Sequence, residues 1–207
     1  MTSLKKLTTA VVLVALVTGS GCSWWRHRNE APAEAAASAG DTPLSIAPAA
    51  LPPDGELMRA ATTLVTDFYE MRQRLGRTGL PDENEMKAYR AFLCPPLAAA
   101  MDAARVRQRV YMDEHPDDKP PLVEGDLFSS LFEGVDVATP SGTEVAGDGA
   151  RVDLSMRFGE GDSAVRWKDT VLLARDQGSW CIADVEYRGD WPFANKGKLS
   201  DTLADPF

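Results

Sequence analysis

The chain has 207 residues, with 22 lysines and arginines against 31 aspartates and glutamates, and a formal net charge of -9 at pH 7. This acidic balance repels nucleic-acid phosphates, and the sequence shows no basic stripe or base-stacking motif to offset the repulsion, so composition argues against a nucleic-acid partner. From residue 54 onward the chain is still long enough for one domain with a hydrophobic core.

Residues 1–21 have the three-part layout of a secretory signal peptide. Lys5 and Lys6 give a positive start, an apolar run covers residues 10–17, and small residues follow up to Gly21. The apolar run is shorter than the roughly 20 residues that a membrane-spanning helix needs. We therefore expect a cleaved signal rather than a retained anchor.

Cys22 follows these small residues directly, and two processing routes fit it. Cleavage by a general signal peptidase would make Cys22 incidental. Alternatively, the segment resembles a bacterial lipoprotein signal, in which the cysteine is acylated, although Gly19 stands where such signals usually carry leucine. We favour lipidation because it explains the cysteine and suits Trp24 and Trp25, whose rings fit the headgroup level.

The compartment follows from the lipidation hypothesis. Ser23, next to the cysteine, resembles the pattern of lipoproteins sent to the outer membrane. We expect a cell-envelope protein that is attached to the outer membrane through its N-terminal lipid and faces the periplasm.

Residues 29–53 are rich in alanine, proline and serine and cannot bury enough apolar surface to become ordered. The predicted organisation is a signal peptide (1–21), a lipidated terminus with a flexible tether (22–53) and a single domain (54–207).

Helices are predicted in the first half of this domain. Asp82 and Glu85 resemble a capping box at the start of a second helix, and Pro95 suits the first turn of a third helix that runs to about Met112. The first helix is indicated by apolar residues spaced by four and three: Leu57, Ala61, Leu64, Phe68, Met71 and Leu75.

The second half of the domain changes to a two-residue period, which is typical of half-buried strands. Glycine-containing turns separate the alternating segments. Helices followed by an antiparallel meander predict an α+β fold with the helices on one face of the sheet. The predicted strands are residues 135–139, 151–158, 165–175 and 180–187.

Four segments carry a family resemblance: LVTDFYEMR (64–72), PPLVEGDLFSSLFEG (120–134), GSWCIADVEY (178–187) and GDWPFANKGKLSDTL (189–203). They are similar to a family of bacterial envelope lipoproteins, the YbjP-type domain of unknown function. The order of elements resembles the nuclear-transport-factor-2-like cone, a curved sheet wrapped over helices. The resemblance implies a fold, a compartment and, since cone domains often pair through the open sheet face, a homodimer as one arrangement. It implies no activity, because cone domains include both enzymes and binding modules.

No catalytic signature is present. The sequence lacks a zinc-protease motif, a paired CxxC, a phosphate loop and a nucleophile elbow, and its two histidines are His27 and His115. The acidic loop 113–126 could offer oxygen ligands to calcium, but it lacks the EF-hand spacing and prolines interrupt it. We interpret it as a solvated loop. The expectation is therefore no catalytic residue, no metal and no cofactor.

The pocket candidates lie in one polar-aromatic segment: Glu124, Asp126, Phe128 and Glu133. In one interpretation Asp126 faces a cleft lined by Phe128 and Phe132. In the interpretation that we favour, Asp126 caps a short helix that runs through Glu133, with Phe128 and Phe132 on its core side.

Farther along, Trp191 and Phe193 are expected to anchor the C-terminal tail, which ends in a short helix.

Cys94 and Cys181 are the remaining cysteines. An oxidising compartment favours a disulfide between them over two buried thiols, because such compartments rarely keep free thiol pairs. The alternative is that each thiol packs as a small apolar group.

Three functions fit the sequence. The favoured one is a non-catalytic envelope lipoprotein that binds an unknown envelope protein or a small ligand. The second is a cone-type enzyme, with Asp126 or Glu124 as a buried general base and Tyr69 or Tyr89 as a proton donor. The third is an inhibitor or immunity-type protein that blocks an enzyme at the cell surface.

Overall fold

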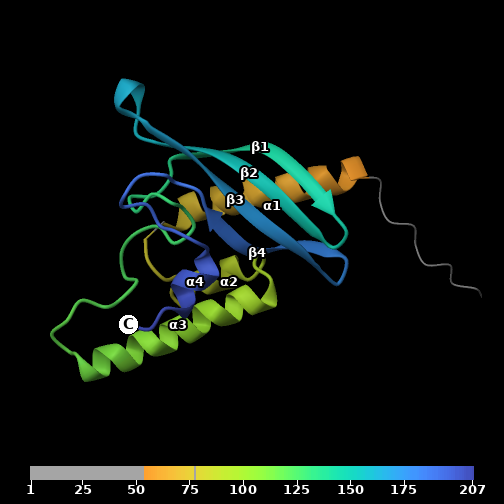
Figure 1. Cartoon of the computed structure of the whole chain (residues 1–207). Helices are drawn as coiled ribbons and strands as arrows, with labels where there is room; N and C mark the ends of the chain where they lie inside the picture. Colours follow the sequence, from red (N-terminus) through yellow and green to blue (C-terminus); the bar gives the residue numbers. More distant parts are fainter. Residues whose placement is uncertain (1–53, 77) are drawn as a thin grey trace, which may run out of the picture. The chain divides into compact units, whose positions relative to one another are not determined.

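A computed structural model describes residues 54–76 and 78–207. The predicted signal peptide, the predicted lipidation site Cys22 and the predicted tether up to residue 53 lie outside these residues. In the described part of the chain, three helices precede a four-stranded sheet and a short helix follows it (Figure 1). None of these helices is long and apolar enough to cross a membrane.

The helices begin where the sequence places its capping residues. The Asp82 backbone N–H donates to Glu85 Oε2 at 2.8 Å, and Asp82 Oδ1 accepts from the Glu85 N–H at 2.8 Å, which confirms the capping box. Pro95 occupies the first turn of the third helix, as expected. The helices are α1 (Asp54–Leu75), α2 (Glu85–Tyr89), α3 (Pro95–Glu114) and α4 (Leu199–Ala204).

The strands form an open antiparallel sheet in the order β1-β2-β3-β4. This confirms the α+β prediction. Gln177 and Gly178 link β3 to β4 with φ angles of 49° and 86°, as a two-residue hairpin turn requires. The strands are β1 (Val137–Ala146), β2 (Gly149–Phe158), β3 (Val165–Asp176) and β4 (Ser179–Tyr187). The first is longer than predicted, because pairing with β2 extends it through residues of weak strand propensity.

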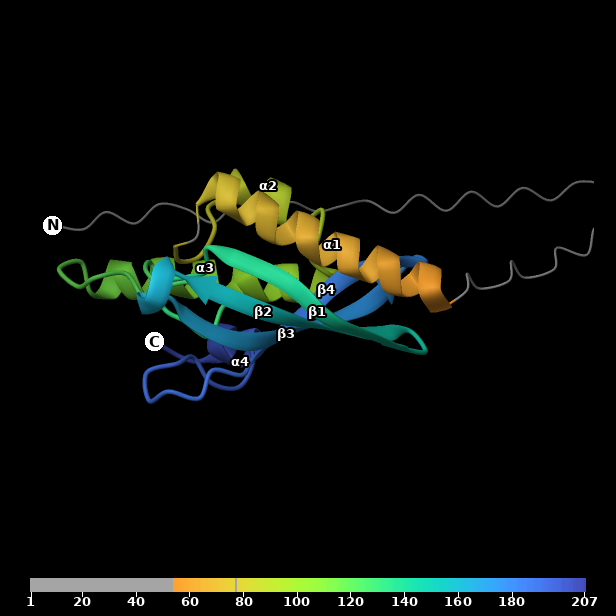
Figure 2. The same ribbon diagram turned by 90° about the horizontal axis from the view of Figure 1, so that it is seen from above.

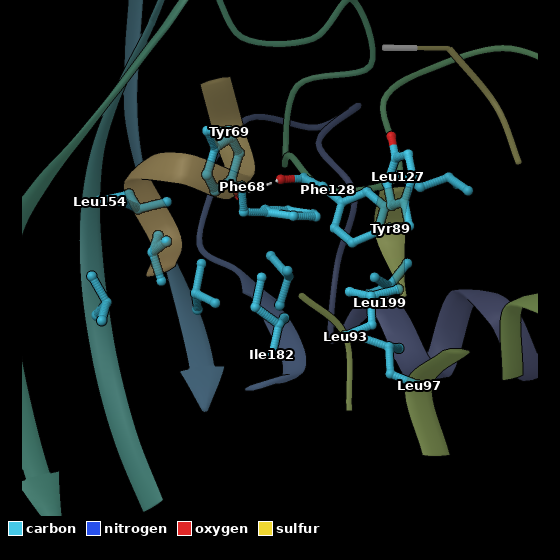
Figure 3. Packing of buried hydrophobic residues seen from close by; sticks show 14 of the residues in the cluster. Phe68, Tyr69, Tyr89, Leu93, Leu97, Leu127, Phe128, Leu154, Ile182 and Leu199 are labelled. Carbon is cyan, nitrogen blue, oxygen red and sulfur yellow. Dashed lines mark hydrogen bonds between the residues drawn. The ribbon is translucent and has the colours of Figure 1, made fainter. Parts of the chain in front are cut away.

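Helix α1 lies along one face of the sheet, called here the inner face (Figure 2). Thr62 Oγ1 of α1 is 2.9 Å from Thr143 Oγ1 of β1. Between the layers, Phe68 packs edge-on against Phe128 with ring centroids 5.0 Å apart, and Leu154 and Ile182 line the strand side of this core (Figure 3). The outer face of the sheet carries the alternate, mostly polar side chains.

The buried stripe of α1 differs from the predicted one at its C-terminal end. Leu75, expected to face the core, is 40% exposed, whereas Arg72 is 2% exposed. The helix therefore turns a charged side chain inward in its last turn. The reason is Asp126, which lies in the interior and pairs with that arginine.

The predicted short helix after Asp126 is absent, since residues 126–134 form turns. Asp126 Oδ1 accepts the Phe128 N–H at 2.8 Å and so caps a turn instead of a helix. Phe132, expected on the core side, is 52% exposed, and Phe193, expected to anchor the tail, is 91% exposed. Both predictions were wrong, because in each loop the neighbouring residues fill the interior and leave these rings outside.

The predicted disulfide between Cys94 and Cys181 is present, with the two Cα atoms 4.9 Å apart. It lies beside a short parallel bridge between Leu93, which precedes α3, and Ile182 of β4. The Ile182 N–H donates to Phe92 O and the Cys94 N–H donates to Ile182 O, each at 2.8 Å. The disulfide therefore ties the helical half of the domain to the last strand.

Candidate functional site

An open groove with a volume of about 650 Å³ lies at the end of the sheet that includes the β2–β3 hairpin. Four of its lining side chains are cationic and one is acidic. The groove is lined by Val137, Thr139, Ser155, Met156, Arg157, Arg166, Trp167, Lys168, Arg188 and Asp190. We call it the cationic groove.

The strand register gathers these cations. Arg157 of β2 lies opposite Arg166 of β3, and Ser155 lies opposite Lys168. Residues that face each other across antiparallel strands share a face of the sheet, so the three cationic side chains lie together on the outer face. Arg188, which directly follows β4, adds a fourth.

Two of the four cations have no partner among the described residues. Within residues 54–76 and 78–207, Arg166 and Lys168 make no ion pair and no side-chain hydrogen bond. Arg157 donates to the Gly159 carbonyl oxygen, and Arg188 Nη1 donates to Thr170 Oγ1 at 3.2 Å. Arg157 and Arg166 are like charges directly opposite each other, an arrangement that destabilises a sheet. An anion bound between these two side chains would remove their repulsion.

Sequence reasoning missed this groove. It found no basic stripe, because the cations are dispersed over residues 157–188 among acidic and apolar neighbours. A usable signal was nevertheless present at the glycine-containing turn between the predicted strands 151–158 and 165–175. Folding the two flanking strands about this turn already brings Arg157 close to Arg166.

A second, apolar pocket of about 630 Å³ adjoins the cationic groove. Trp167 of the groove packs edge-on against Trp191 of the pocket, with ring centroids 6.0 Å apart and an interplanar angle of 80°. The apolar pocket is lined by Leu131, Phe132, Glu133, Val165, Trp191 and Phe193. It includes Glu133, one of the four predicted pocket residues, and the two aromatic rings that the sequence wrongly assigned to the interior.

Asp169 of β3 is fully buried and lies beside Trp167, at the boundary between these two surfaces. Its carboxylate accepts hydrogen bonds from the Ser130 N–H (2.8 Å), the Ser130 hydroxyl, Trp167 Nε1 (2.9 Å) and the Arg188 N–H (2.9 Å). Burial raises the pKa of the Asp169 carboxyl, against the lowering effect of these hydrogen bonds. The carboxylate thereby joins the loop before β1 and the segment after β4 to the sheet.

Asp169→Asn is expected to lower the free energy of unfolding by about 2–4 kcal/mol. The amide nitrogen would face N–H and O–H groups whose hydrogen bonds the carboxylate now accepts. Urea unfolding of the purified domain at neutral pH measures the change. Asp148→Asn is the matched control, since Asp148 is exposed in the β1–β2 turn, and it should stay within about 0.5 kcal/mol. A loss for Asp169→Asn no larger than that of the control would contradict the assigned role.

The other predicted pocket residues are separated by the fold. Asp126 and Phe128 are buried together, whereas Glu124 is exposed and pairs with Lys119. Arg72 Nη2 donates to Asp126 Oδ1 at 2.5 Å, and the Arg72 guanidinium lies 4.6 Å from the centroid of the Phe128 ring. Neither of the two surfaces described above includes Asp126.

The two tyrosines suggested as proton donors lie beside this ion pair. Burial alone would lower the pKa of Arg72, but Asp126 and the two tyrosines raise it, so the guanidinium stays charged. Burial raises the pKa of Tyr69 well above its ordinary value, and the Tyr69 hydroxyl donates to Phe128 O at 2.8 Å (Figure 3). The Tyr89 hydroxyl accepts from Arg72 Nε at 3.4 Å.

The acidic loop 113–126 assembles no metal site. Among the residues that the structure describes, no group of three or more histidine, cysteine, aspartate or glutamate side chains is placed to hold a metal ion. His115 stacks on Tyr111 with ring centroids 4.5 Å apart.

Comparison with protein-family models, with curated proteins and with solved structures finds no match to this chain.

Proposed function

We propose that the protein is a non-catalytic, lipid-anchored module of the bacterial envelope, and that its domain binds an anionic partner in the cationic groove. The observation that carries this proposal is that Arg166 and Lys168, which have no partner in the described part of the chain, lie beside Arg157 on a chain of net charge -9. An acidic protein that concentrates cations in one groove creates a local positive field that attracts anions.

The envelope assignment rests on other observations. The Cys94–Cys181 disulfide is consistent with an oxidising, extracytoplasmic compartment. Lipidation accounts for Cys22, and the resemblance to YbjP-type envelope lipoproteins agrees with both. We interpret the open sheet with α1 across its inner face as a variant of the nuclear-transport-factor-2-like cone. A permanent homodimer through the outer face is not part of the proposal, because permanent interfaces are apolar at their centre and this face is charged.

Inorganic pyrophosphate is the simplest probe of the groove. We expect it to shift the NMR signals of residues 155–168 in a saturable way, with binding that weakens as salt is added. The double variant Arg166→Gln/Lys168→Gln should bind at least about tenfold more weakly, because it removes two charge-assisted contacts.

The matched control is Arg59→Gln/Arg109→Gln, which removes two exposed cations from α1 and α3 and changes the net charge equally. If this control weakens pyrophosphate binding as much as the groove variant does, the affinity depends on the net charge of the protein and not on the groove. The proposed site would then be wrong.

A further inference from the structure

The first residues of β3, Val165–Lys168, form a free strand edge between the cationic groove and the apolar pocket. The pairing of β3 with β4 ends at Asp169 and Tyr187, and the β2–β3 hairpin continues past that point (Figure 1). The next N–H, that of Arg188, donates to the side-chain oxygens Asp169 Oδ1 and Ser130 Oγ instead of to a backbone carbonyl of β3. In the described part of the chain, no backbone hydrogen bond joins residues 188–198 to Val165–Lys168.

The backbone groups that face this open side can be identified. The Tyr187 N–H points away from β3, since it donates to Gly197 O at 3.0 Å. Backbone groups of an antiparallel strand alternate in direction, so those that point toward β4 belong to Thr170, Lys168 and Arg166. Thr170 still lies opposite Glu186 of β4. In residues 54–76 and 78–207, no strand lies beside the N–H and C=O groups of Lys168 and Arg166.

The side chains along this edge alternate in character. Arg166 and Lys168 point to the outer face and line the cationic groove, whereas Val165 points to the inner face and lines the apolar pocket. A strand laid along the edge would therefore meet cations on one side and aromatic rings on the other. Edge cations repel a second copy of the same edge, which leaves an acidic strand as the complementary occupant.

We propose that an extended peptide segment with alternating acidic and apolar residues binds as an added strand along Val165–Lys168, antiparallel to β3 as β4 is. This inference rests on the proposed function, because the acidic side chains would fill the cationic groove. The apolar side chains would fill the pocket formed by Phe132, Trp191 and Phe193. Main-chain hydrogen bonds to Arg166 and Lys168 would supply affinity, and the two surfaces would supply specificity, as in other strand-addition complexes.

The test uses the folded domain and two peptides of one composition. The alternating peptide is Ac-Glu-Val-Glu-Phe-Glu-Val-NH2, and the block peptide is Ac-Glu-Glu-Glu-Val-Phe-Val-NH2. In a peptide strand antiparallel to β3, as β4 is, a residue directly opposite Arg166 or Lys168 has its side chain on the same face as these cations and its N–H toward β3. N-methylation of the central glutamate therefore removes a main-chain donor to β3. N-methylation of the phenylalanine is the matched control, since that N–H would point away from β3.

We expect the alternating peptide to bind at least about tenfold more tightly than the block peptide. N-methylation at the glutamate should remove this advantage, while N-methylation at the phenylalanine should leave most of it. Binding should also slow the amide hydrogen exchange of Arg166 and Lys168, a readout that side-chain contacts alone would not produce.

Each contrary result has a distinct meaning. Equal binding of the alternating and block peptides, both weakened by Arg166→Gln/Lys168→Gln, would overturn strand addition and leave the anion groove intact. Binding to phosphatidylglycerol vesicles with no binding of either peptide would overturn it in favour of a lipid surface. If neither the peptides nor pyrophosphate binds, both this inference and the proposed function fail.

Discussion

Replacing Arg72 with methionine is expected to lower the free energy of unfolding by about 3–5 kcal/mol. The two side chains of the Arg72–Asp126 pair are 2% and 0% exposed. The substitution would keep an apolar side chain in place of the arginine stem but leave the Asp126 carboxylate buried without its counter-charge. Chemical denaturation followed by circular dichroism measures the loss.

Two controls separate the missing charge from other effects. Arg74→Gln breaks an exposed pair with Glu70, whose atoms are 4.0 Å apart, and should cost no more than about 1 kcal/mol. The double variant Arg72→Met/Asp126→Asn removes both charges and keeps an oxygen to accept the Phe128 N–H. It should be at least about 1 kcal/mol more stable than Arg72→Met alone. A single variant as stable as the double one would show that the loss comes from packing.

Removal of the Cys94–Cys181 disulfide is the second change with a large expected effect. The bond spans 87 residues of sequence, and the chain-entropy model gives about 4–5 kcal/mol for closing a loop of that length. We expect the Cys94→Ala/Cys181→Ala domain to unfold at a clearly lower urea concentration than the oxidised wild type. Adding reductant should bring the wild type close to the variant and leave the variant unchanged. A variant whose midpoint equals that of the oxidised wild type would contradict the expectation.

Local pattern was a good guide to the elements of this fold. The three-and-four spacing around Phe68 predicted α1, and strict alternation from Arg151 to Phe158 predicted β2 to within two residues. These patterns succeed because a helix or strand must turn one apolar face toward the core. That requirement fixes the spacing of apolar residues within a short stretch of sequence. The disulfide was also predictable, because cysteine count and compartment restricted the pairing.

The candidate site was harder to predict because it depends on distant pairing. Nothing near Arg72 in the sequence indicates a buried cation, since its partner Asp126 lies 54 residues away. The cationic groove likewise exists only once β2 and β3 are in register, with Arg157 opposite Arg166. Local propensity carries no information on such contacts, and the capping residues around Asp126 favoured a helix where tertiary pairing produced a turn.

The opposite edge of the sheet determines how many strands the domain can accept. Pro140 of β1 has no N–H to offer, and the register of β1 shifts between Pro140 and Gly142. A strand approaching β1 would find its hydrogen-bond ladder interrupted at this point. We therefore expect the proposed strand addition to have a stoichiometry of one peptide per domain. A peptide bound along Val165–Lys168 would then not connect successive copies of the domain into a fibre.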